Sequence, residues 1–444
     1  MARYPNQTVP AALLNNSHFE NFQVWAAGIL GTLCRDQARH LRESELQLAN
    51  GMGHLTYSTL VHAGDTWDDI WASLRKFVPQ VKKNVSPKEK FGVSLRISGA
   101  TSETLVNAPE KRADLRHFLA DNDMYLYTVN AFPHGPFKNR IVKEQVYEPD
   151  WSSETRLRYT MNVATILADV APDFVNPSIQ TPPLGFKPNV TSEAVIEAYA
   201  ENIRKLATHV NNIRRYDGRT VTLAIEPEPA CFLETTEETI DFFKRYLRSE
   251  KSLVNLAGKT GATLDGARDI MARHVGIVYD ICHQAVEYED ITQSLRALKD
   301  NEIGVWKLQE AAAMMIPVVT REMVEAVRKY ARTIYLTQTH QRTSDGGITR
   351  FLNLEDAIAA WEKKPVECEW RIHFHVPVFL EDLGPFKSTR YAITEALAFQ
   401  KQHRLSDQLE IETYTWDVLP DELKTGEIVE YVTKEIEWVK SQLV

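Results

Sequence analysis

Short apolar runs alternate with longer stretches of helical hydrophobic spacing from about residue 54 to the end of the chain. A continuous apolar run bounded by turn residues is typical of a strand buried on both faces, as in a parallel sheet. The pattern therefore predicts eight core strands, at 54–62, 91–98, 124–131, 177–181, 221–226, 276–280, 303–309 and 408–413.

The stretches between these runs predict helices, at about 66–81, 109–121, 153–169, 191–215, 236–249, 265–273, 290–299, 354–362, 388–402 and 427–442. Repeated strand–helix units favour a parallel sheet with right-handed crossovers, and eight of them suggest a closed (β/α)8 barrel. Two further strand-like runs, 333–339 and 370–378, form a predicted insertion between the seventh and eighth strands. No linker divides residues 54–444, so they are expected to form one domain.

The first 53 residues stand apart as a predicted N-terminal extension. Residues 1–18 are polar and rich in asparagine, whereas 19–49 have the spacing of one amphipathic helix that ends at Asn50-Gly51. We expect this helix to pack as an added arm or to mediate self-association.

Composition narrows the functional class. The 444 residues are 43% hydrophobic and carry a net charge of −9, which argues against nucleic-acid binding because such proteins need a basic surface. The four cysteines are far apart and form no CxxC, which fits a reducing compartment. No apolar run approaches the roughly 18 residues of a membrane span, so a cytoplasmic location is expected.

Polar residues gather at the predicted carboxyl ends of the strands, which share one mouth in a barrel. These residues are Glu226 and Glu228 on the fifth strand, Asp280 and His283 on the sixth, Lys307 and Gln309 on the seventh, Glu412 on the eighth, and His373 and His375 on the inserted run. Such a mixed nitrogen and oxygen set suits Zn²⁺, Mn²⁺, Mg²⁺ or Co²⁺. The alternatives are a helix N-cap at Asp280 with a solvent-facing His283, solvated acids at Glu226 and Glu228, and an ordinary histidine pair on a strand.

This layout resembles the xylose isomerase-like TIM barrels, which include sugar isomerases, sugar epimerases and endonuclease IV. The resemblance implies that Glu226, Asp280, His283 and Glu412 fall on metal-ligand positions. The seventh-strand ligand of that superfamily is usually histidine, whereas this chain has Gln309, with Lys307 two residues before it. A glutamine binds metal through its carbonyl oxygen, and more weakly.

Several motifs are similar to those of the EboE family, described as metabolite traffic proteins. They are Val61–Trp67 (VHAGDTW), Asn130–Phe137 (NAFPHGPF), Val142–Trp151 (VKEQVYEPDW), Glu226–Thr235 (EPEPACFLET), Asp280–His283 (DICH), His373–Pro377 (HFHVP) and Glu412–Asp417 (ETYTWD). The resemblance covers about residues 54–442 and implies a role in making or moving a metabolite, with other proteins of the same pathway as possible partners.

Further polar and aromatic residues are expected around the mouth as substrate contacts. Aromatic rings with a cation and an imidazole suit a sugar, polyol or cyclitol, where rings stack and hydroxyls form hydrogen bonds. The candidates are His62 and Asn130 at strand ends, His134, Lys143, Tyr147 and Trp151 on the long loop after the third strand, Lys187 after the fourth, and Glu228.

Three functions are consistent with these residues. The first is a metal-dependent isomerase, epimerase or lyase on a sugar-like or cyclitol-like metabolite, in which Glu226 and Glu412 pass a proton and His375 or Lys307 assists. The second is a non-catalytic metabolite-binding protein on the same scaffold. The third is a phosphodiesterase resembling endonuclease IV, against which the acidic charge balance counts.

Overall fold

The computed structural model describes Leu48 and residues 51–443, apart from 139, 332, 420–422 and 425. These residues belong to one compact unit. The predicted helix over 19–49 lies outside the described residues, so its role in self-association stays a prediction. Within the described part of the chain, no helix is both long enough and apolar enough to cross a bilayer.

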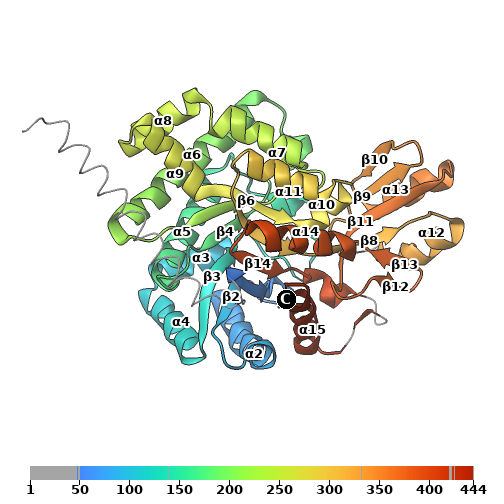
Figure 1. The fold of residues 1–444 in the computed structure, drawn as a ribbon, viewed down its shortest axis with the longest axis horizontal. Coiled ribbons are helices and arrows are strands. Elements are labelled where there is room, and N and C mark those ends of the chain that lie inside the picture. Colours follow the sequence, from blue (N-terminus) through green and yellow to red (C-terminus); the bar gives the residue numbers. More distant parts are fainter. Residues whose placement is uncertain are drawn as a thin grey trace, which may run out of the picture. The chain divides into compact units, whose positions relative to one another are not determined.

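Eight parallel strands form a closed barrel at the centre of this unit (Figure 1). The strands are β1 (His54–Tyr57), β2 (Phe91–Arg96), β3 (Met124–Asn130), β4 (Ser178–Thr181), β5 (Thr222–Ile225), β6 (Val275–Asp280), β7 (Val305–Glu310) and β14 (Gln408–Ile411). Each pairs in parallel with its neighbour in the order β1-β14-β7-β6-β5-β4-β3-β2. A parallel bridge between Ser58 and Ser94 joins the two ends. The (β/α)8 barrel predicted from the hydrophobic pattern is confirmed.

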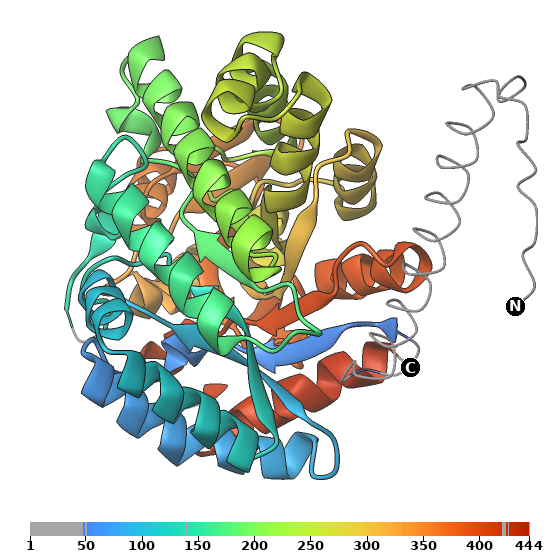
Figure 2. The same ribbon diagram turned by 90° about the vertical axis from the view of Figure 1, so that its left-hand side faces the viewer.

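Helices cover the outside of the barrel, and Figure 2 shows α5 and α6 side by side on one flank. The helices are α2 (Trp67–Val85), α3 (Gly99–Asn107), α4 (Pro109–Asp121), α5 (Glu154–Val170), α6 (Glu193–Asp217), α7 (Thr236–Phe242), α8 (Glu250–Thr260), α9 (Leu264–His274), α10 (Ile281–Val286), α11 (Ile291–Asp300), α12 (Arg321–Val327), α13 (Leu354–Lys363), α14 (Arg390–His403) and α15 (Ile428–Leu443). Short helical turns occupy Thr59–Val61, Lys143–Tyr147, Lys187–Asn189, Phe243–Leu247, Arg328–Tyr330 and Tyr414–Val418.

Local sequence explains where these helices begin and end. The Thr66 and Thr235 hydroxyls each accept from the backbone N–H three residues on, while Asp69 and Glu238 bond back to the capping residue. These reciprocal bonds satisfy donors that a helix start leaves free. Helix α6 ends at Gly218, whose φ of 73° is a left-handed conformation that glycine adopts without a side-chain clash. The positions of the barrel helices therefore follow from short-range chemistry.

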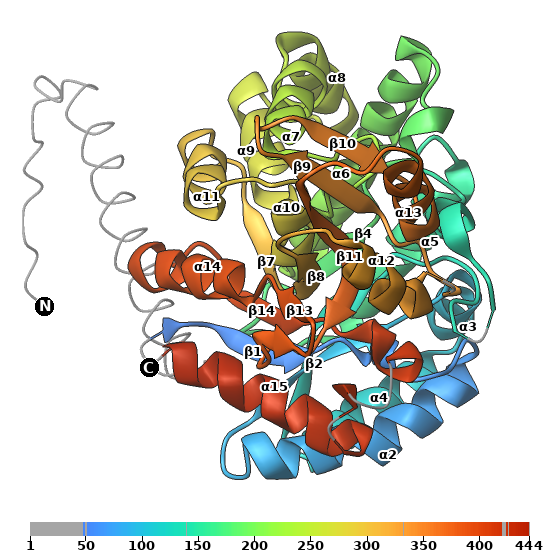
Figure 3. The same cartoon turned by 90° about the vertical axis from the view of Figure 1, so that its right-hand side faces the viewer.

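A second sheet fills the connection between β7 and β14 (Figure 3). Its strands are β8 (Ala312–Ile316), β9 (Thr339–Thr343), β10 (Ile348–Phe351), β11 (Cys368–Val376), β12 (Asp382–Leu383) and β13 (Phe386–Ser388), antiparallel in the order β10-β9-β11-β8-β13-β12. The predicted strand at 370–378 corresponds to β11. The predicted strand at 333–339 is wrong, because pairing begins only at Thr339. Strand β8 was missed, since only Ala311 separates it from β7 and no turn residue marks the break.

Strand β11 carries an irregularity beside the two histidines of the HFH motif. Ile372 pairs with Met314 and His375 with Ala313, so three steps along β11 match one step along β8. Such bulges bend a strand and redirect its side chains, and they often occur next to functional sites. Here the irregularity lies between Ile372 and His375, in the segment that contains both histidines.

Close approach of two strands requires glycine at position 276. A Cβ placed on Gly276 would collide with the carbonyl oxygen of Gly304 and with the indole of Trp306. We expect Gly276→Ala to lower the free energy of unfolding by about 3 kcal/mol, because the barrel wall must shift to admit the methyl group. Gly258, exposed on α8 with open space around it, is the matched control. Gly258→Ala should stabilise the protein by up to about 1 kcal/mol in the same denaturation experiment.

Candidate functional site

A cavity opens above the carboxyl ends of the barrel strands. Its polar lining comes from strand ends and from β11, and its walls are largely aromatic and aliphatic. The lining residues are Leu60, Asn130, Phe132, Pro133, Phe137, Val142, Lys143, Val146, Tyr147, Gln180, Glu226, Glu228, His283, Tyr335, Leu336, Gln338, His373, Glu412 and Tyr414. A concave, mostly apolar pocket with a few convergent polar groups is the usual form of a small-molecule site.

Three buried carboxylates surround one amide, and we name them the carboxylate cluster: Glu226 and Glu412, which line the cavity, and Asp280. Oxygens of the three lie within 4.8 Å of one another. The Nε2 atom of Gln309 lies between them, 2.8 Å from Glu226 Oε1, 2.6 Å from Asp280 Oδ2 and 2.8 Å from Glu412 Oε2. An amide carries two hydrogens, so it can serve only two of these three acceptors at once.

Burial and mutual repulsion favour protons on this cluster. Glu226 is almost fully buried, and burial followed by the charges of Glu412 and Asp280 raises its pKa well above the ordinary value. Burial, with repulsion from Glu410 and Asp280, likewise raises the pKa of Glu412. Adjacent carboxylates that cannot both ionise share a proton, which places an acid and a base in one site.

Three histidines beside the carboxylates form a second group, which we name the imidazole cluster: His283 on α10 with His373 and His375 on β11. Nε2 of His373 lies 3.2 Å from Nε2 of His283 and 3.2 Å from Nε2 of His375. All three side chains are buried. Burial, then the neighbouring imidazoles, lowers the pKa of His373 well below its ordinary value, and burial lowers the pKa of His375 to about 4. The neutral forms of His373 and His375 are therefore favoured.

The hydrogen bonds of the other ring nitrogens determine the tautomers. Each Nδ1 faces one acceptor: the carbonyl of Pro227 at 2.8 Å for His283, Oε1 of Gln338 at 2.9 Å for His373, and the carbonyl of Glu412 at 2.6 Å for His375. The Gln338 amide is oriented by its Nε2, which donates toward Glu228 Oε1 and the Pro229 carbonyl. In a neutral ring each Nδ1 therefore carries the hydrogen, and the Nε2 lone pairs of His283 and His375 both face Nε2 of His373.

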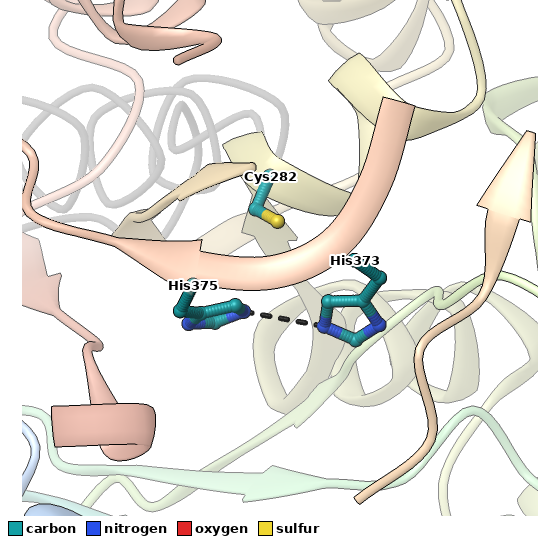
Figure 4. Close-up of side chains that lie close together, drawn as sticks. All are labelled: Cys282, His373 and His375. Carbon is teal, nitrogen blue, oxygen red and sulfur yellow. Dashed lines mark hydrogen bonds between the residues drawn. The ribbon is translucent and has the colours of Figure 1, made fainter. Parts of the chain in front are cut away.

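Asp280 belongs to both clusters. Its Oδ1 accepts from the backbone N–H of His283 at 3.1 Å, so it caps α10. Its Oδ2 faces Gln309 and lies 3.6 Å from Nε2 of His283. The cap alternative is thus right for Asp280, but His283 is buried and does not face solvent. Cys282, on the same helix, has its sulfur within 4.8 Å of ligand atoms on His373 and His375 (Figure 4).

The seven predicted metal ligands, Glu226, Asp280, His283, Gln309, His373, His375 and Glu412, are therefore brought together as two adjoining clusters. The structure also places Gln180 beside them, which sequence reasoning missed. Its Nε2 donates to Glu226 Oε2 at 2.6 Å, and its Oε1 accepts from Lys307 Nζ at 2.6 Å. The sequence offered one signal for Gln180, which is its position as a lone glutamine near the end of the short fourth strand.

Lys307 does not line the cavity. Its ammonium group is fully buried inside the barrel, 3.0 Å from Glu410 Oε2, and it reaches Glu226 only through Gln180. The geometry gives Lys307 a positioning role for Glu226.

Four of the predicted substrate contacts border the cavity: Asn130, Lys143, Tyr147 and Glu228. Asn130 donates to Glu412 Oε1 at 3.1 Å, and the Lys143 ammonium donates to Asn353 Oδ1 at 3.0 Å. Burial raises the pKa of Glu228, whose Oε1 accepts from the Tyr147 hydroxyl at 2.8 Å.

The other four predicted substrate contacts lie elsewhere. His62 stacks on Phe77 and bonds to Tyr57, outside the cavity. His134 packs edge-on against Tyr159, and Trp151 is a core residue whose Nε1 donates to Thr181. Lys187 pairs with Glu234 and Glu238. These residues follow strands as predicted, but each side chain turns to a structural partner.

Sequence reasoning also missed the wall contributed by residues 335–338. Tyr335, Leu336 and Gln338 line the cavity although they come from the connection before β9. The Phe137 ring stacks on Tyr335 at 4.9 Å, which joins the loop after β3 to this connection. No local pattern marks these residues, because only the folding of the inserted sheet over the barrel brings them to the mouth.

A buried acid, Glu435 on α15, supports the segments that carry Glu412 and His375. Its Oε1 accepts from the Thr413 hydroxyl at 2.8 Å and from the Val378 N–H at 3.3 Å. Burial raises the pKa of Glu435 from 4.5 to about 8. Between these values the folded state holds a proton that the unfolded chain releases, so this group makes the free energy of unfolding fall as pH rises.

The isosteric variant Glu435→Gln removes that titration. Relative to the native protein, it should become more stable as pH rises from 5 to 8, by at most about 1.4 kcal/mol for each pH unit. Urea denaturation at several pH values measures the difference. Glu437→Gln, an exposed acid on the same helix, should show no such trend; a parallel pH dependence in both variants would contradict the assignment to Glu435.

Known proteins resemble this chain in structure but not in sequence. Neither a protein-family model nor a curated protein matches the sequence. Similar solved structures include a xylose isomerase-like TIM barrel protein from Mycobacterium smegmatis in complex with magnesium (12% identity, 88% of this chain, 98% of that chain, TM-score 0.45). Another is L-ribulose 3-epimerase, with 10% identity over 88% of this chain and 94% of that chain and a TM-score of 0.45. A third is the IOLI protein with a bound zinc atom, with 12% identity over 88% of this chain and 98% of that chain and a TM-score of 0.44. At such identities and scores, these likenesses carry no argument about the chemistry of this chain.

Proposed function

We propose that this protein is a metal-dependent isomerase or epimerase that moves a proton at a carbon next to a carbonyl group in a sugar-like or cyclitol-like metabolite. The observation that carries the proposal is the pair Glu226 and Glu412. Both carboxyl groups border the cavity, both have raised pKa values, and both contact the same Gln309 nitrogen. A pair of carboxyl groups, one able to accept a proton and the other to donate one, is suited to such proton transfer.

In this mechanism the ionised member of the pair removes the proton from the substrate carbon, and the protonated member returns one to the neighbouring carbon or to the opposite face. Asn130 and Gln180 keep the two carboxyl groups in place through their bonds to Glu412 Oε1 and Glu226 Oε2. Lys307 holds Gln180 from below. These contacts leave the base little rotational freedom, which favours transfer at one defined carbon.

The residues at the base of the cavity also fit a divalent metal ion. His283 and His373 line the cavity with their Nε2 atoms 3.2 Å apart, and His375 Nε2 lies 3.2 Å from His373 Nε2. When bound next to the substrate, such an ion would polarise the carbonyl group and acidify the adjacent C–H bond.

The cavity walls support the choice of a polyhydroxylated substrate. Aromatic rings of Phe132, Tyr147, Tyr335 and Tyr414 line the cavity. Rings of this kind stack on the C–H faces of sugars, while amide and carboxyl groups take hydrogen bonds from hydroxyls. The similarity of seven motifs to the EboE family adds the expectation that the substrate belongs to a small-molecule pathway.

Isotope exchange with a panel of candidate substrates tests the proposal. The protein, loaded with Zn²⁺, Mn²⁺, Mg²⁺ or Co²⁺ in turn, is incubated in D₂O with ketopentoses, ketohexoses and ketocyclitols. Mass spectrometry should show deuterium at one carbon-bound position of at least one compound. If a member of the panel binds, yet neither the native protein nor any metal-loaded form exchanges it, the protein is a binder and the enzyme proposal is wrong.

A further inference from the structure

We infer that the imidazole cluster, and not the carboxylate cluster, is the ion-binding site of this chain, and that the Gln309 amide takes the place of a cation among the carboxylates. The inference deepens the proposed function, and it rests on that function for its catalytic meaning. It moves the ion onto β11, a strand of the inserted sheet, and leaves Glu226 and Glu412 free for proton transfer.

The Nε2 atoms of the imidazole cluster lie close together without a hydrogen between them. Both contacts of His373 Nε2, to His283 and to His375, measure 3.2 Å. Because the three Nδ1 atoms face Pro227 O, Gln338 Oε1 and Glu412 O, no Nε2 of the neutral tautomers carries a hydrogen to place between them. Buried acceptors this close, without a donor, destabilise the fold unless a positive centre lies among them. A metal ion supplies that centre.

The spacing of these nitrogen atoms is also close to that of nitrogens bound to one zinc ion. Nitrogens bound to one tetrahedral zinc ion at about 2.0–2.1 Å stand about 3.3 Å apart. The two separations that involve His373 Nε2 are both 3.2 Å and match this value. His283 and His375 also offer ligand atoms within 4.8 Å of each other and of Asp280, so a small rotation of one ring would complete the set. Each ring is already oriented by an Nδ1 hydrogen bond to a carbonyl-type oxygen, which is the usual outer support of a zinc-binding histidine.

The fourth position of this site has candidates already in place. Asp280 Oδ2 lies 3.6 Å from His283 Nε2, and His283 and His373 both border the cavity. An ion held by three imidazoles would therefore have Asp280 on one side and open space for a substrate oxygen on the other. Three protein nitrogens with an open position are characteristic of catalytic zinc sites, and imidazole ligands favour Zn²⁺ or Co²⁺ over Mg²⁺.

The carboxylate cluster, by contrast, already has a hydrogen-bond donor at its centre. Gln309 Nε2 lies 2.6–2.8 Å from all three carboxylates, where a bound cation would otherwise sit. Turning the amide over would point its oxygen at three acidic groups. The amide nitrogen thus occupies the position at which one cation would contact all three carboxyl groups.

Metal content and cobalt spectroscopy test the inference without any substrate. The full-length chain is stripped with a chelator, reloaded with Zn²⁺ or Co²⁺, freed of excess ion by gel filtration and assayed by elemental analysis. One equivalent of ion per chain is expected, and the Co²⁺ form should show the intense visible absorption of a four-coordinate, nitrogen-rich site. X-ray absorption of the zinc-loaded native protein should show imidazole scattering, a measurement that depends on no variant.

Variants then separate the two clusters. His373→Ala should weaken zinc binding by more than about 100-fold, since losing a ligand costs at least as much as losing its outer support. Glu226→Gln and Glu412→Gln should keep the ion and its cobalt spectrum, because the backbone carbonyl that orients His375 remains. His209→Gln, a half-buried histidine on α6 far along the chain from both clusters, is the matched control and should bind as the native protein does.

Two results would overturn the inference. Retention of zinc by a folded His373→Ala, or an oxygen-dominated absorption spectrum of the native protein, excludes the imidazole cluster. Two equivalents of ion per native chain exclude the role given to Gln309. Failure of the proposed function has a different signature, in which one zinc ion binds to the imidazoles but no compound of the panel exchanges deuterium.

Discussion

Lys307→Met is expected to lower the free energy of unfolding by about 3–5 kcal/mol. Lys307 and Glu410 form an ion pair at 3.0 Å inside the barrel, and both side chains are fully buried. Removing the ammonium group leaves the Glu410 carboxylate charged without a partner in a region that water does not reach. It also removes the hydrogen bond that Lys307 donates to Gln180 Oε1, so the support of Glu226 weakens at the same time.

Chemical denaturation of two further variants tells whether the loss comes from the unpaired charge. The double variant Lys307→Met, Glu410→Leu removes both charges and should recover most of the stability, because well-packed apolar side chains replace buried ion pairs at little net cost. Lys387→Met breaks the exposed pair with Asp382 and should change stability by less than about 1 kcal/mol. Equal losses in the single and double variants at position 307 would show that packing, rather than charge, accounts for the effect.

Glu412→Gln is expected to reduce deuterium exchange by about 10²–10⁴-fold while leaving the fold and the bound ion intact. The amide keeps the size of the side chain and can still contact Asn130, but it can neither accept nor return a proton. Glu226→Gln should have an effect of similar size, since the proposed mechanism needs one acid and one base. In the native protein, exchange should depend on pH as a bell-shaped curve, because its acid limb reports the base and its alkaline limb reports the acid.

Glu144→Gln is the matched control for these two variants. Glu144 is an exposed acid on the turn beside Lys143, so it lies near the cavity without contributing to its lining. Its exchange rate should equal that of the native protein. If Glu226→Gln and Glu412→Gln also exchange at the native rate, the carboxylate pair carries no proton and the mechanism is wrong.

The chain by itself determined the barrel and the strand ends of the candidate site. Continuous apolar runs separated by helical spacing can be buried in few other ways than as parallel strands with outer helices. Because such strands end at a common mouth, residues as distant in sequence as Glu226, Asp280 and Glu412 could be expected to meet. In the folded protein, oxygens of the three lie within 4.8 Å of one another.

The tertiary structure alone decided which of the residues at the strand ends reach the cavity. His62, Trp151 and Lys187 also follow strands, yet packing and ion pairing turn them away from the cavity. Gln180 and Gln338 carry no distinctive motif, and they matter only because long-range folding sets them against Glu226 and His373.

The split into carboxylate and imidazole clusters has the same origin. It depends on an irregular strand that brings His373 and His375 to His283, and on a Gln309 side chain that reaches the centre of three acids. Periodicity in a sequence reports which face of an element is buried. It does not report the direction of a side chain within that face, which depends on contacts between residues far apart in the chain.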